Sequence, residues 1–444
     1  MTKTVADHSA GYTAAICNFA ATGHVLPDAA KAHAERLLAD TLAGGAAGAA
    51  SPEAQHMLAA VKGWGHSEDS RLLSLDGRLP APSAAFFNGF AIHCLEWDAV
   101  HEPAVVHALS VVTAALLAAS DRKGGSDSEA FLTALAIGVD IASGIGLSAT
   151  GPMRFFRPAS AGIIGAALAV ARLEAIAPVH YPDVMGLAYS FCSGTMQAHV
   201  EASVALPLQI GNAARAAITA VDLVKADMDG PHNALQGPFG YSALIEEIDL
   251  ADYVASLGKV WRIAEVSIKP YPSGRASHGA LGALAGIQEE HGLKPDDIDS
   301  IALYAPPLIH RLVGRSYKAD MSPAYARLCF AILAPMMLRD GHIDPRHFDA
   351  AGLNDQALVP LANNTQVVLD DNPDGNALAP QRLVLSCRNG KTIERTIDAN
   401  LGSPEAPMNS AQYNQKYSLC RDLADTLCDP RIFDHPLVYA TEPK

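Results

Sequence analysis

The most restrictive feature of the chain is its Ala-rich part, which extends from about residue 10 to about residue 255. Apolar residues recur there at helical spacing, and the alternation typical of strands is scarce. Because Ala side chains are small, such helices can approach one another closely, so we expect a large all-helical domain over residues 1–258. The clearest helical stretches are Ala54–Trp64, Glu129–Leu147 and Ala29–Ala43, the last of which we expect to end at Gly44-Gly45.

The pattern changes after about residue 258, where short strands alternate with helices. Predicted strands are Ser300–Tyr304, Thr365–Leu369, Arg382–Cys387 and Thr392–Ile397, and predicted helices are His278–His291 and Pro323–Arg339, with a kink at Pro335. Asn389-Gly390 predicts a type I′ hairpin turn between the last two strands. We therefore expect a smaller α+β lid domain over residues 259–400, with residues 401–444, helical over Ser410–Leu427, packing back on the first domain. The fold class is mainly α.

Composition narrows the function. A chain of 444 residues is too long for one small core. The formal net charge of -15 argues against nucleic acid or an anionic membrane as a partner, but a local cluster of Arg and Lys could still bind a small anion. The Cys residues form no CxxC pair and no HExxH motif occurs, so we expect reduced thiols and no metal.

We also expect a cytoplasmic protein without membrane spans. Met1–His8 has no apolar core of the signal-peptide type. No stretch looks long and apolar enough to cross a membrane, since the run Ala159–Ala171 is bounded by Pro158 and Arg172.

Titratable residues are concentrated just before an uncharged apolar stretch that begins at Ala108. His107 is preceded by Glu96, Asp98, His101 and Glu102. One interpretation is a general acid/base whose orientation and pKa the carboxylates set. The alternative is a solvated cluster at the start of a helix, or a buried His that a backbone carbonyl satisfies.

A second candidate lies where the two predicted domains meet, in Lys269-Pro270-Tyr271-Pro272 and, a little further on, His278. The prolines restrict the backbone, so the directions of Lys269 and Tyr271 are constrained. Lys269 could bind a carboxylate or act as a base, and Tyr271 and His278 could bind the substrate or share a proton. A rigid linker with an exposed Lys is the alternative.

A third candidate contains two arginines, Arg154 and Arg157, before an apolar helix. Arg157 and the free N–H groups at the helix start could bind an anion. A surface loop with solvated arginines is the commoner arrangement.

Taken together, the three stretches resemble the MmgE/PrpD family, which includes 2-methylcitrate dehydratase, cis-aconitate decarboxylase and iminodisuccinate epimerase. The resemblance covers nearly the whole chain. It is carried by Asn88-Gly89, His93-x-Leu95-Glu96-x-Asp98, His107, Pro158–Gly162, Pro207–Arg215, Lys269–Pro272 with Arg275 and His278, Ala326-Arg327 and Pro407-Met408. It implies a helical domain, a smaller α+β lid, an active site between them and a homodimer.

The chain also departs from the family pattern. Glu96 stands for an aspartate, Val100 for a threonine, and Ala108-Leu109 for Pro-Ser. Arg157 and Gly274 stand where members have histidines, and Leu206 where they often have a substrate-binding lysine. His107, Lys269 and an acidic residue remain from the decarboxylase-like set.

The expected function is a cofactor-independent lyase, a dehydratase or decarboxylase, which acts on a small di- or tricarboxylate by proton abstraction next to a carboxylate. His107 is the expected general acid/base, Glu96 or Asp98 orients it, and Lys269 with Arg157 clamps a carboxylate. Tyr271, His278 and His101 are further substrate-binding candidates. The alternatives are an epimerase or isomerase of an amino-, imino- or unsaturated dicarboxylate, and a non-catalytic carboxylate-binding protein.

Overall fold

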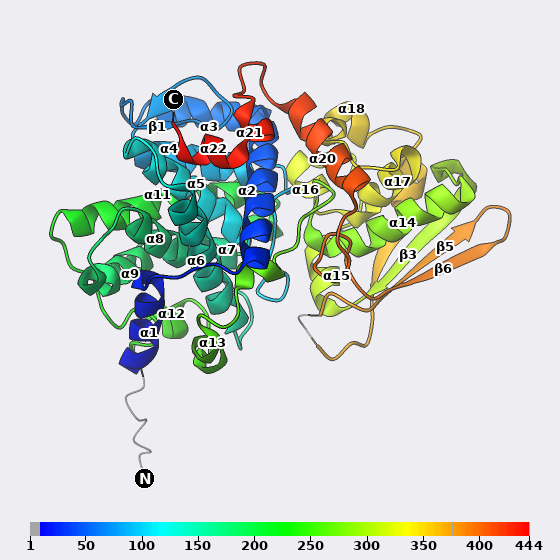
Figure 1. Cartoon of the computed structure of the whole chain (residues 1–444). Helices are drawn as coiled ribbons and strands as arrows, with labels where there is room; N and C mark the ends of the chain where they lie inside the picture. Colours follow the sequence, from blue (N-terminus) through cyan, green and yellow to red (C-terminus); the bar gives the residue numbers. More distant parts are fainter. Residues whose placement is uncertain (1–8, 375–376, 444) are drawn as a thin grey trace, which may run out of the picture.

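The computed structural model describes residues 9–374 and 377–443, so the segment Met1–His8, in which we looked for a signal peptide, lies outside the described residues. The fold is mainly α and contains two hydrophobic cores. One core uses residues 16–268 and 408–440, and the other uses residues 271–397. In Figure 1 the helical part lies on the left, and the sheet with α14 and α17 lies on the right.

The helical part is built from long helices joined by short ones. Its long helices are α1 (Ser9–Ala21), α2 (Asp28–Ala49), α3 (Pro52–Lys62), α4 (Ala81–His93), α5 (Ala108–Arg122), α6 (Ser128–Leu147), α8 (Gly162–Leu173), α9 (Tyr181–Ser190) and α11 (Ala205–Lys225). Its short elements are β1 (Ser70–Arg71), β2 (Arg78–Leu79), α7 (Arg157–Ser160), η1 (Pro178–His180), α10 (Gln197–Val200), α12 (Tyr241–Leu244), α13 (Ala251–Ser256) and η2 (Arg262–Glu265).

Helix α4 occupies the centre of this part and carries the start of the acidic stretch at its C-terminal end. It packs against α2, α5 and α11, and nearly all of its residues are buried. The expected end of α2 at Gly44-Gly45 is wrong, because α2 continues to Ala49. A Cβ on Gly48 would lie 2.0 Å from the carbonyl oxygen of Ala91 in α4. The glycines of α2 therefore permit a close approach of two helices instead of ending one.

Helix α6 corrects the expectation that no stretch could span a membrane. By length and composition it qualifies, and 89% of its most apolar window is buried inside the protein. It packs between α5 and α8. A core helix that other helices surround is apolar on all sides, because none of its sides meets water. A membrane helix is apolar for the same reason.

The second part is α+β. Its helices are η3 (Arg275–Ser277), α14 (His278–His291), η4 (Pro295–Asp297), α15 (Pro307–Val313), α16 (Pro323–Ala326), α17 (Phe330–Asp340), η5 (Pro345–Phe348), α18 (Ala350–Leu353) and α19 (Val359–Asn363). Its strands are β3 (Ile298–Ala305), β4 (Thr365–Leu369), β5 (Gln381–Cys387) and β6 (Thr392–Ile397). The predicted helix Pro323–Arg339 is thus two helices, with Pro335 inside the second.

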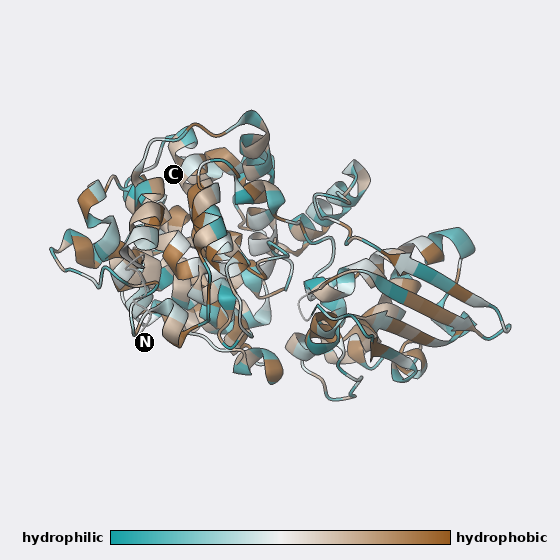
Figure 2. Ribbon diagram, turned by 90° about the horizontal axis from the view of Figure 1, so that it is seen from below, coloured by the Kyte–Doolittle hydropathy of each residue, from teal (hydrophilic) through white to brown (hydrophobic). Residues whose placement is uncertain are grey.

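The strands form one mixed sheet in the order β4-β3-β5-β6, in which β3 and β4 are parallel and the other pairs antiparallel. Buried and more exposed residues alternate along β3 and β5, and Figure 2 shows brown and teal segments alternating along the strands. This is the pattern of a sheet with one covered face. Helices α14 and α17 pack against it.

The predicted hairpin between β5 and β6 is present, but its type I′ turn is wrong. Type I′ needs positive φ at both central residues, and in this turn only Gly390 has it, with φ 84°. The Cys387 N–H donates to the carbonyl oxygen of Lys391 at 2.8 Å, which leaves a three-residue loop. Gly390 takes the left-handed position that such loops require.

The C-terminal tail forms α20 (Ser410–Leu423), α21 (Arg431–Asp434) and α22 (Pro436–Thr441), all in contact with α2. In Figure 1, α21 and α22 are drawn in red beside α2. The Lys416 ammonium of α20 is buried, 2.5 Å from Asp40 Oδ1 of α2, and donates to the carbonyl oxygen of Trp97 at 3.1 Å. The tail thereby contacts the acidic stretch between α4 and α5.

Candidate active site

The loop between α4 and α5 brings its two ends together. His93 is the last residue of α4, and His107 directly precedes α5. Glu96 has φ 55° and Val105 has φ 54°, and His101 pairs with Val106 in an antiparallel bridge. The loop therefore folds back on itself, and the imidazole centroids of His93 and His107 lie 4.9 Å apart.

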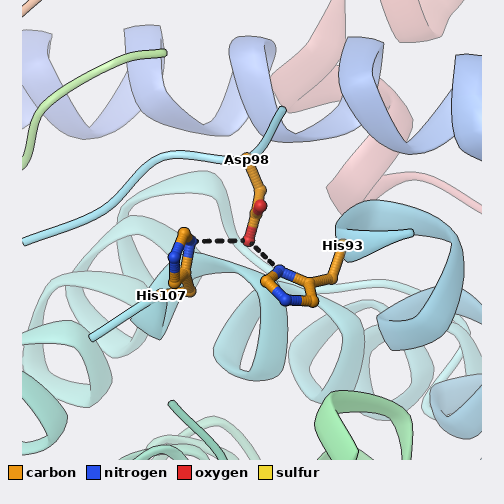
Figure 3. Close-up of side chains that lie close together, drawn as sticks. All are labelled: His93, Asp98 and His107. Carbon is orange, nitrogen blue, oxygen red and sulfur yellow. Dashed lines mark hydrogen bonds and ion pairs between the residues drawn. The ribbon is translucent and has the colours of Figure 1, made fainter. Parts of the chain in front are cut away.

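Asp98 lies between these two histidines (Figure 3). Its Oδ2 accepts a hydrogen bond from His93 Nδ1 at 2.9 Å and lies 3.0 Å from His107 Nδ1. The Ser110 hydroxyl of α5 donates to the same oxygen. Burial acts to raise the pKa of Asp98, but the charges and hydrogen bonds of His107 and His93 outweigh it and hold that pKa well below 3.8. Asp98 is therefore an ionised carboxylate at neutral pH.

The pKa values of the two histidines are shifted in opposite directions although the rings share a carboxylate. Burial acts to lower the pKa of His93, but the charges of Asp98 and Glu96 outweigh it, so the pKa rises above 6.5. Burial also acts to lower the pKa of His107, and there it prevails over Asp98, helped by the charge of Lys269, so the pKa falls below 6.5. Two neighbouring groups with opposite pKa shifts are the arrangement that general acid and general base catalysis requires.

Lys269 joins this cluster from the segment between the two cores. Its side chain is fully buried, and its Nζ donates to the carbonyl oxygen of Glu96 at 3.1 Å and to Glu96 Oε2 at 3.3 Å. It also lies 3.9 Å from Asp98 Oδ1. Burial acts to raise the pKa of Glu96, but the charges of Lys269, His93 and His107 together outweigh it, so this pKa falls below 4.5. Lys269, from the second candidate stretch, thus lies beside Glu96, Asp98 and His107 of the first.

A cavity of about 680 Å³, including its open mouth, adjoins this cluster. Both parts of the chain line it. The first part contributes His93, Glu96, Val100, Glu102, Val105, His107, Met153, Phe156, Pro158, Met196, His199 and Leu206, and the second contributes Gly274, Arg275, Ala276, Leu308, Leu312, Leu328 and Leu378.

Arg157 has other contacts than those expected of a carboxylate clamp. Its guanidinium lies against Glu246, with Nη2 2.7 Å from Oε1 and Nε 2.8 Å from Oε2, and Nη1 donates to the carbonyl oxygen of Ala104 at 3.3 Å. Both side chains are buried, and Arg157 is not among the residues that line the cavity. A buried guanidinium needs a buried carboxylate, and here the protein supplies it. The expected clamp of Lys269 with Arg157 is therefore not formed.

The three other substrate-binding candidates also lie outside the cavity lining. His101 Nε2 is 2.9 Å from Glu265 Oε2. The rings of Tyr271 and His278 are in contact, with centroids 5.4 Å apart and an interplanar angle of 60°, and His278 Nε2 donates to the carbonyl oxygen of Ser273 at 3.1 Å. Burial, with the charges of Arg275 and Lys269, holds the pKa of His278 well below 6.5. His278 is thus a neutral residue that supports the loop carrying Arg275.

His93, Asp98 and His107 could also hold a metal ion, because their donor atoms all lie within 4.8 Å of one another. Within residues 9–374 and 377–443, they form the one such set. The Lys269 ammonium, 3.9 Å from Asp98 Oδ1, disfavours a dication beside this carboxylate. The hydrogen bond from His93 and the proximity of His107 already use Asp98 Oδ2. The arrangement fits a proton-transfer cluster better than a metal site.

Two family models match successive parts of the chain. The MmgE/PrpD N-terminal domain matches residues 14–251, and the MmgE/PrpD C-terminal domain matches residues 271–427. The chain belongs to the MmgE/PrpD family. It is 25% identical over 377 residues to cis-aconitate decarboxylase of Mus musculus, covering 79% of this chain and 75% of that protein. It is 26% identical over 360 residues to the Homo sapiens protein of the same name, covering 77% and 73% of the two chains.

A third MmgE/PrpD relative extends over nearly the whole chain. The cis-aconitate decarboxylase-like protein oryM of Aspergillus oryzae is 22% identical over 456 residues, covering 97% of this chain and 94% of that protein. Four positions at which this chain departs from the family pattern line the cavity, namely Glu96, Val100, Leu206 and Gly274. The other departures, Arg157 and Ala108-Leu109, do not line it.

The sequence did not indicate a catalytic role for His93, although His93 begins the motif that resembles the family pattern. The sequence feature that could have indicated His93 is its position at the end of an apolar stretch, directly before the acidic residues Glu96 and Asp98. The sequence also did not indicate His199 or the pair Glu102–Arg275, which lie at the cavity wall. Arg275 Nη2 donates to Glu102 Oε1 at 2.6 Å across a gap of 173 residues, which no local spacing reveals.

Proposed function

We propose that this protein is a lyase that removes a proton next to a carboxylate of a small organic acid. The observation that supports this most directly is the pair of histidines on one buried carboxylate, with opposite pKa shifts, at the wall of a cavity. A base must be neutral and an acid protonated at the same pH, and these shifts meet both conditions. The relatives named cis-aconitate decarboxylase favour a carboxylate substrate.

The residues then have distinct roles. His107 removes the proton, Asp98 orients both rings and stabilises the imidazolium that forms, and His93 donates a proton to the leaving group. In a dehydration, the C–H pair forms the C=C bond while the C–O bond breaks, and the hydroxide takes the proton of His93 and leaves as water. In a decarboxylation, the C–C bond breaks, CO₂ leaves and the carbanion takes a proton from an imidazolium. The charge of Lys269 favours the ionised form of Glu96.

The test is replacement of the base. We expect His107→Gln to lower turnover of an active di- or tricarboxylate by about 10²- to 10⁴-fold, the usual contribution of a general base. The exposed His56 offers a matched control, because His56→Gln changes the same side chain away from the cavity. A panel of hydroxy- and unsaturated acids, followed by ultraviolet absorbance and CO₂ release, separates dehydration from decarboxylation. Unchanged turnover in a folded His107→Gln variant would refute the assignment.

Lys269 needs a separate test, since its loss also affects folding. Lys269→Met leaves Glu96 and Asp98 without their cation, so we expect lower turnover together with a lower melting temperature. Full turnover with an unchanged melting temperature would show that Lys269 serves neither role.

An epimerase is the second candidate, and the two imidazoles on one carboxylate favour it. One ring could remove a proton and the other return it to the opposite face. Incubation in D₂O separates the two reactions, because epimerisation incorporates deuterium and changes optical rotation without a new chromophore. A lyase creates a C=C bond or releases CO₂.

We also propose that the protein is a homodimer. Light scattering after size-exclusion chromatography would detect twice the 46.5 kDa mass of the chain. A single species at the monomer mass would contradict this.

A further inference from the structure

Arg315 is a guanidinium beside the cavity that has no ion pair among the described residues. It makes one hydrogen bond with them, from Nη2 to the backbone carbonyl oxygen of His199, and it lies over the ring of Tyr325, 5.1 Å from the centroid. Its Nη1 is buried and has no partner among the same residues. A charged group removed from water in this way normally has an opposite charge beside it.

Two contacts place Arg315 at the edge of the cavity. His199, to which it donates, lines the cavity from the helical part. On the other side, Gly314 pairs with Cys329 in an antiparallel bridge, which places Arg315 across from Leu328, another residue of the cavity wall. Arg315 thus joins the two parts of the chain where both of them line the cavity.

The cations on the other sides of the cavity are already paired with carboxylates of the protein. The pairs are Lys269–Glu96 at 3.3 Å, Arg275–Glu102 at 2.6 Å and Arg157–Glu246 at 2.7 Å. All six side chains are buried or nearly so. A substrate carboxylate could bind one of these cations only by leaving a buried carboxylate without its partner, which is strongly unfavourable. Arg315 can bind an anion without breaking an ion pair.

Arg327 also has no ion pair among the described residues, but its surroundings differ. Its Nη1 donates to the carbonyl oxygen of Cys94 at 2.9 Å, and it lines a neighbouring hollow instead of the cavity. Glu53 and Glu96 line the same hollow. An anion that entered there would face two carboxylates, so Arg327 is the poorer partner for a substrate.

The segment around Arg315 carries an excess of positive charge. Arg311 precedes it by four residues and Lys318 follows it by three, and neither has an ion pair within the part of the chain that the structure describes. Asp320 is the one acidic residue between positions 306 and 322, and it is exposed. In a chain with a formal net charge of -15, such a local excess favours the approach of a small anion at this place.

The pKa of His199 shows that these charges act inside the cavity. Burial, with the charges of Arg315 and Arg311, lowers this pKa to about 4, although the charge of Glu96 acts in the opposite direction. The field that disfavours a positive charge on His199 favours a negative charge beside it. The end of the cavity that His199 forms therefore suits a carboxylate.

We propose that Arg315 binds a carboxylate of the substrate at the end of the cavity that His199 forms. Hydrogen bonds to a carboxylate are roughly twice as strong as those to a neutral carbonyl. A carboxylate can therefore replace the carbonyl oxygen of His199 as the partner of Nη2 and also accept from the free Nη1. Arg315 is half-buried and outside the cavity lining, so its side chain turns toward the ligand on binding. The inference rests on the proposed function only in taking the ligand to be a carboxylic acid.

Binding of a tricarboxylate that cannot react tests this role. Propane-1,2,3-tricarboxylate has no hydroxyl group to eliminate and no C=C bond, and calorimetry with the full chain at pH 7 measures its Kd. We expect Arg315→Met to weaken binding by about 10- to 100-fold, the usual contribution of hydrogen bonds to a charged group. Arg315→Lys should lose less, because it keeps the charge but not the paired N–H donors.

Three results would overturn the proposal. They are unchanged binding in a folded Arg315→Met variant, equal losses in Arg315→Met and Arg315→Lys, and no binding of the tricarboxylate by the wild-type chain. Equal losses in the two variants would mean that Arg315 only supports the cavity wall through its bond to His199. Melting temperatures of both variants establish that they are folded.

Arg382 of β5 gives a matched control. Its guanidinium also lies over a tyrosine ring, 4.0 Å from the centroid of Tyr304, and it does not line the cavity. We expect Arg382→Met to leave the Kd near the wild-type value. A loss in Arg382→Met as large as that in Arg315→Met would reflect the net charge of the chain and would overturn the proposal.

Turnover separates this inference from the proposed lyase. Because Arg315 holds the substrate away from the histidines, we expect Arg315→Met to raise KM by about tenfold or more with little change in kcat. An unchanged KM in this variant would refute the role of Arg315 and leave the lyase intact. If the tricarboxylate binds and depends on Arg315 but no acid turns over, the proposed lyase fails and the carboxylate site stands.

Discussion

At the scale of the residue, the proposed chemistry depends on one buried carboxylate, Asp98. Asp98 stays ionised although it is buried, because two imidazoles and a hydroxyl surround its Oδ2. In return it raises the pKa of His93. The sequence indicated His107, Glu96, Asp98 and Lys269 by residue type and local density. It did not indicate His93, because the end of a helix and the acidic turn after it become neighbours only through the conformation of the loop.

The opposite shifts of the two histidines predict a bell-shaped pH dependence of kcat/KM. His107 must be neutral, and its pKa lies below 6.5, so activity rises as pH increases through that lowered value. His93 must be protonated, and its pKa lies above 6.5, so activity falls as pH increases through that raised value. The acid limb therefore lies below pH 6.5 and the alkaline limb above it. Activity that rises monotonically from pH 5 to pH 9 would contradict the role of His93.

Asp98→Asn should disturb both histidines. Because Asp98 raises the pKa of His93, we expect its removal to shift the alkaline limb to lower pH and to reduce kcat by about 10²- to 10⁴-fold. NMR titration of the histidine rings measures the shift directly. Asp140→Asn is a matched control, since Asp140 is equally buried but bonds to Tyr253 and the Arg262 N–H, not to a histidine. An unmoved alkaline limb in Asp98→Asn would rule out the assigned pair.

At the scale of the element, periodicity located the helices and strands well, and glycines misled the prediction of helix ends. Helix α14 and strands β4 and β6 have the predicted bounds. Helix α2 does not, because a Gly-Gly pair usually ends a helix and here lies inside one. A glycine can end a helix or lie inside one where another helix packs closely against it. The local sequence does not distinguish these cases, because packing is a tertiary property.

Two glycines of α2 give a matched pair of variants. A Cβ on Gly48 would meet Ala91 O at 2.0 Å, whereas a Cβ on Gly44 would meet nothing within 4 Å. We expect Gly44→Ala to raise the free energy of unfolding by about 0.5–1 kcal/mol through helix propensity. Gly48→Ala should lower it by about 1–3 kcal/mol, because α2 and α4 must separate. Urea denaturation of both variants measures this difference, and equal effects would contradict the close approach.

At the scale of the whole molecule, the C-terminal tail packs on α2 and contacts the loop that carries Asp98. Lys416 of α20 lies against Asp40 of α2 and the carbonyl oxygen of Trp97, next to Asp98. The sequence predicted that the tail is helical. It carried no signal for the partner of Lys416, because Asp40 and Trp97 are more than 300 residues away along the chain.

Removal of Lys416 should therefore destabilise the protein as a whole. We expect Lys416→Met to lower the free energy of unfolding by on the order of 3 kcal/mol, because it leaves Asp40 buried without its cation. Adding Asp40→Asn in the same chain should recover part of that loss, since no charge then remains unpaired. Thermal or urea unfolding of the single and double variants measures the coupling. Purely additive losses would show that the two side chains do not interact.

By itself, the sequence determined the properties that depend on local pattern: a helical part, an α+β part, the hairpin between β5 and β6 and a group of titratable residues before α5. Tertiary structure alone decided which side chains share a site. It placed His93 beside Asp98, bound Arg157 to Glu246 across 89 residues, and lined the cavity with apolar residues from both parts. The physical reason is that the cost of burying a charge depends on which partner packs against it, and packing joins residues that are distant in the chain.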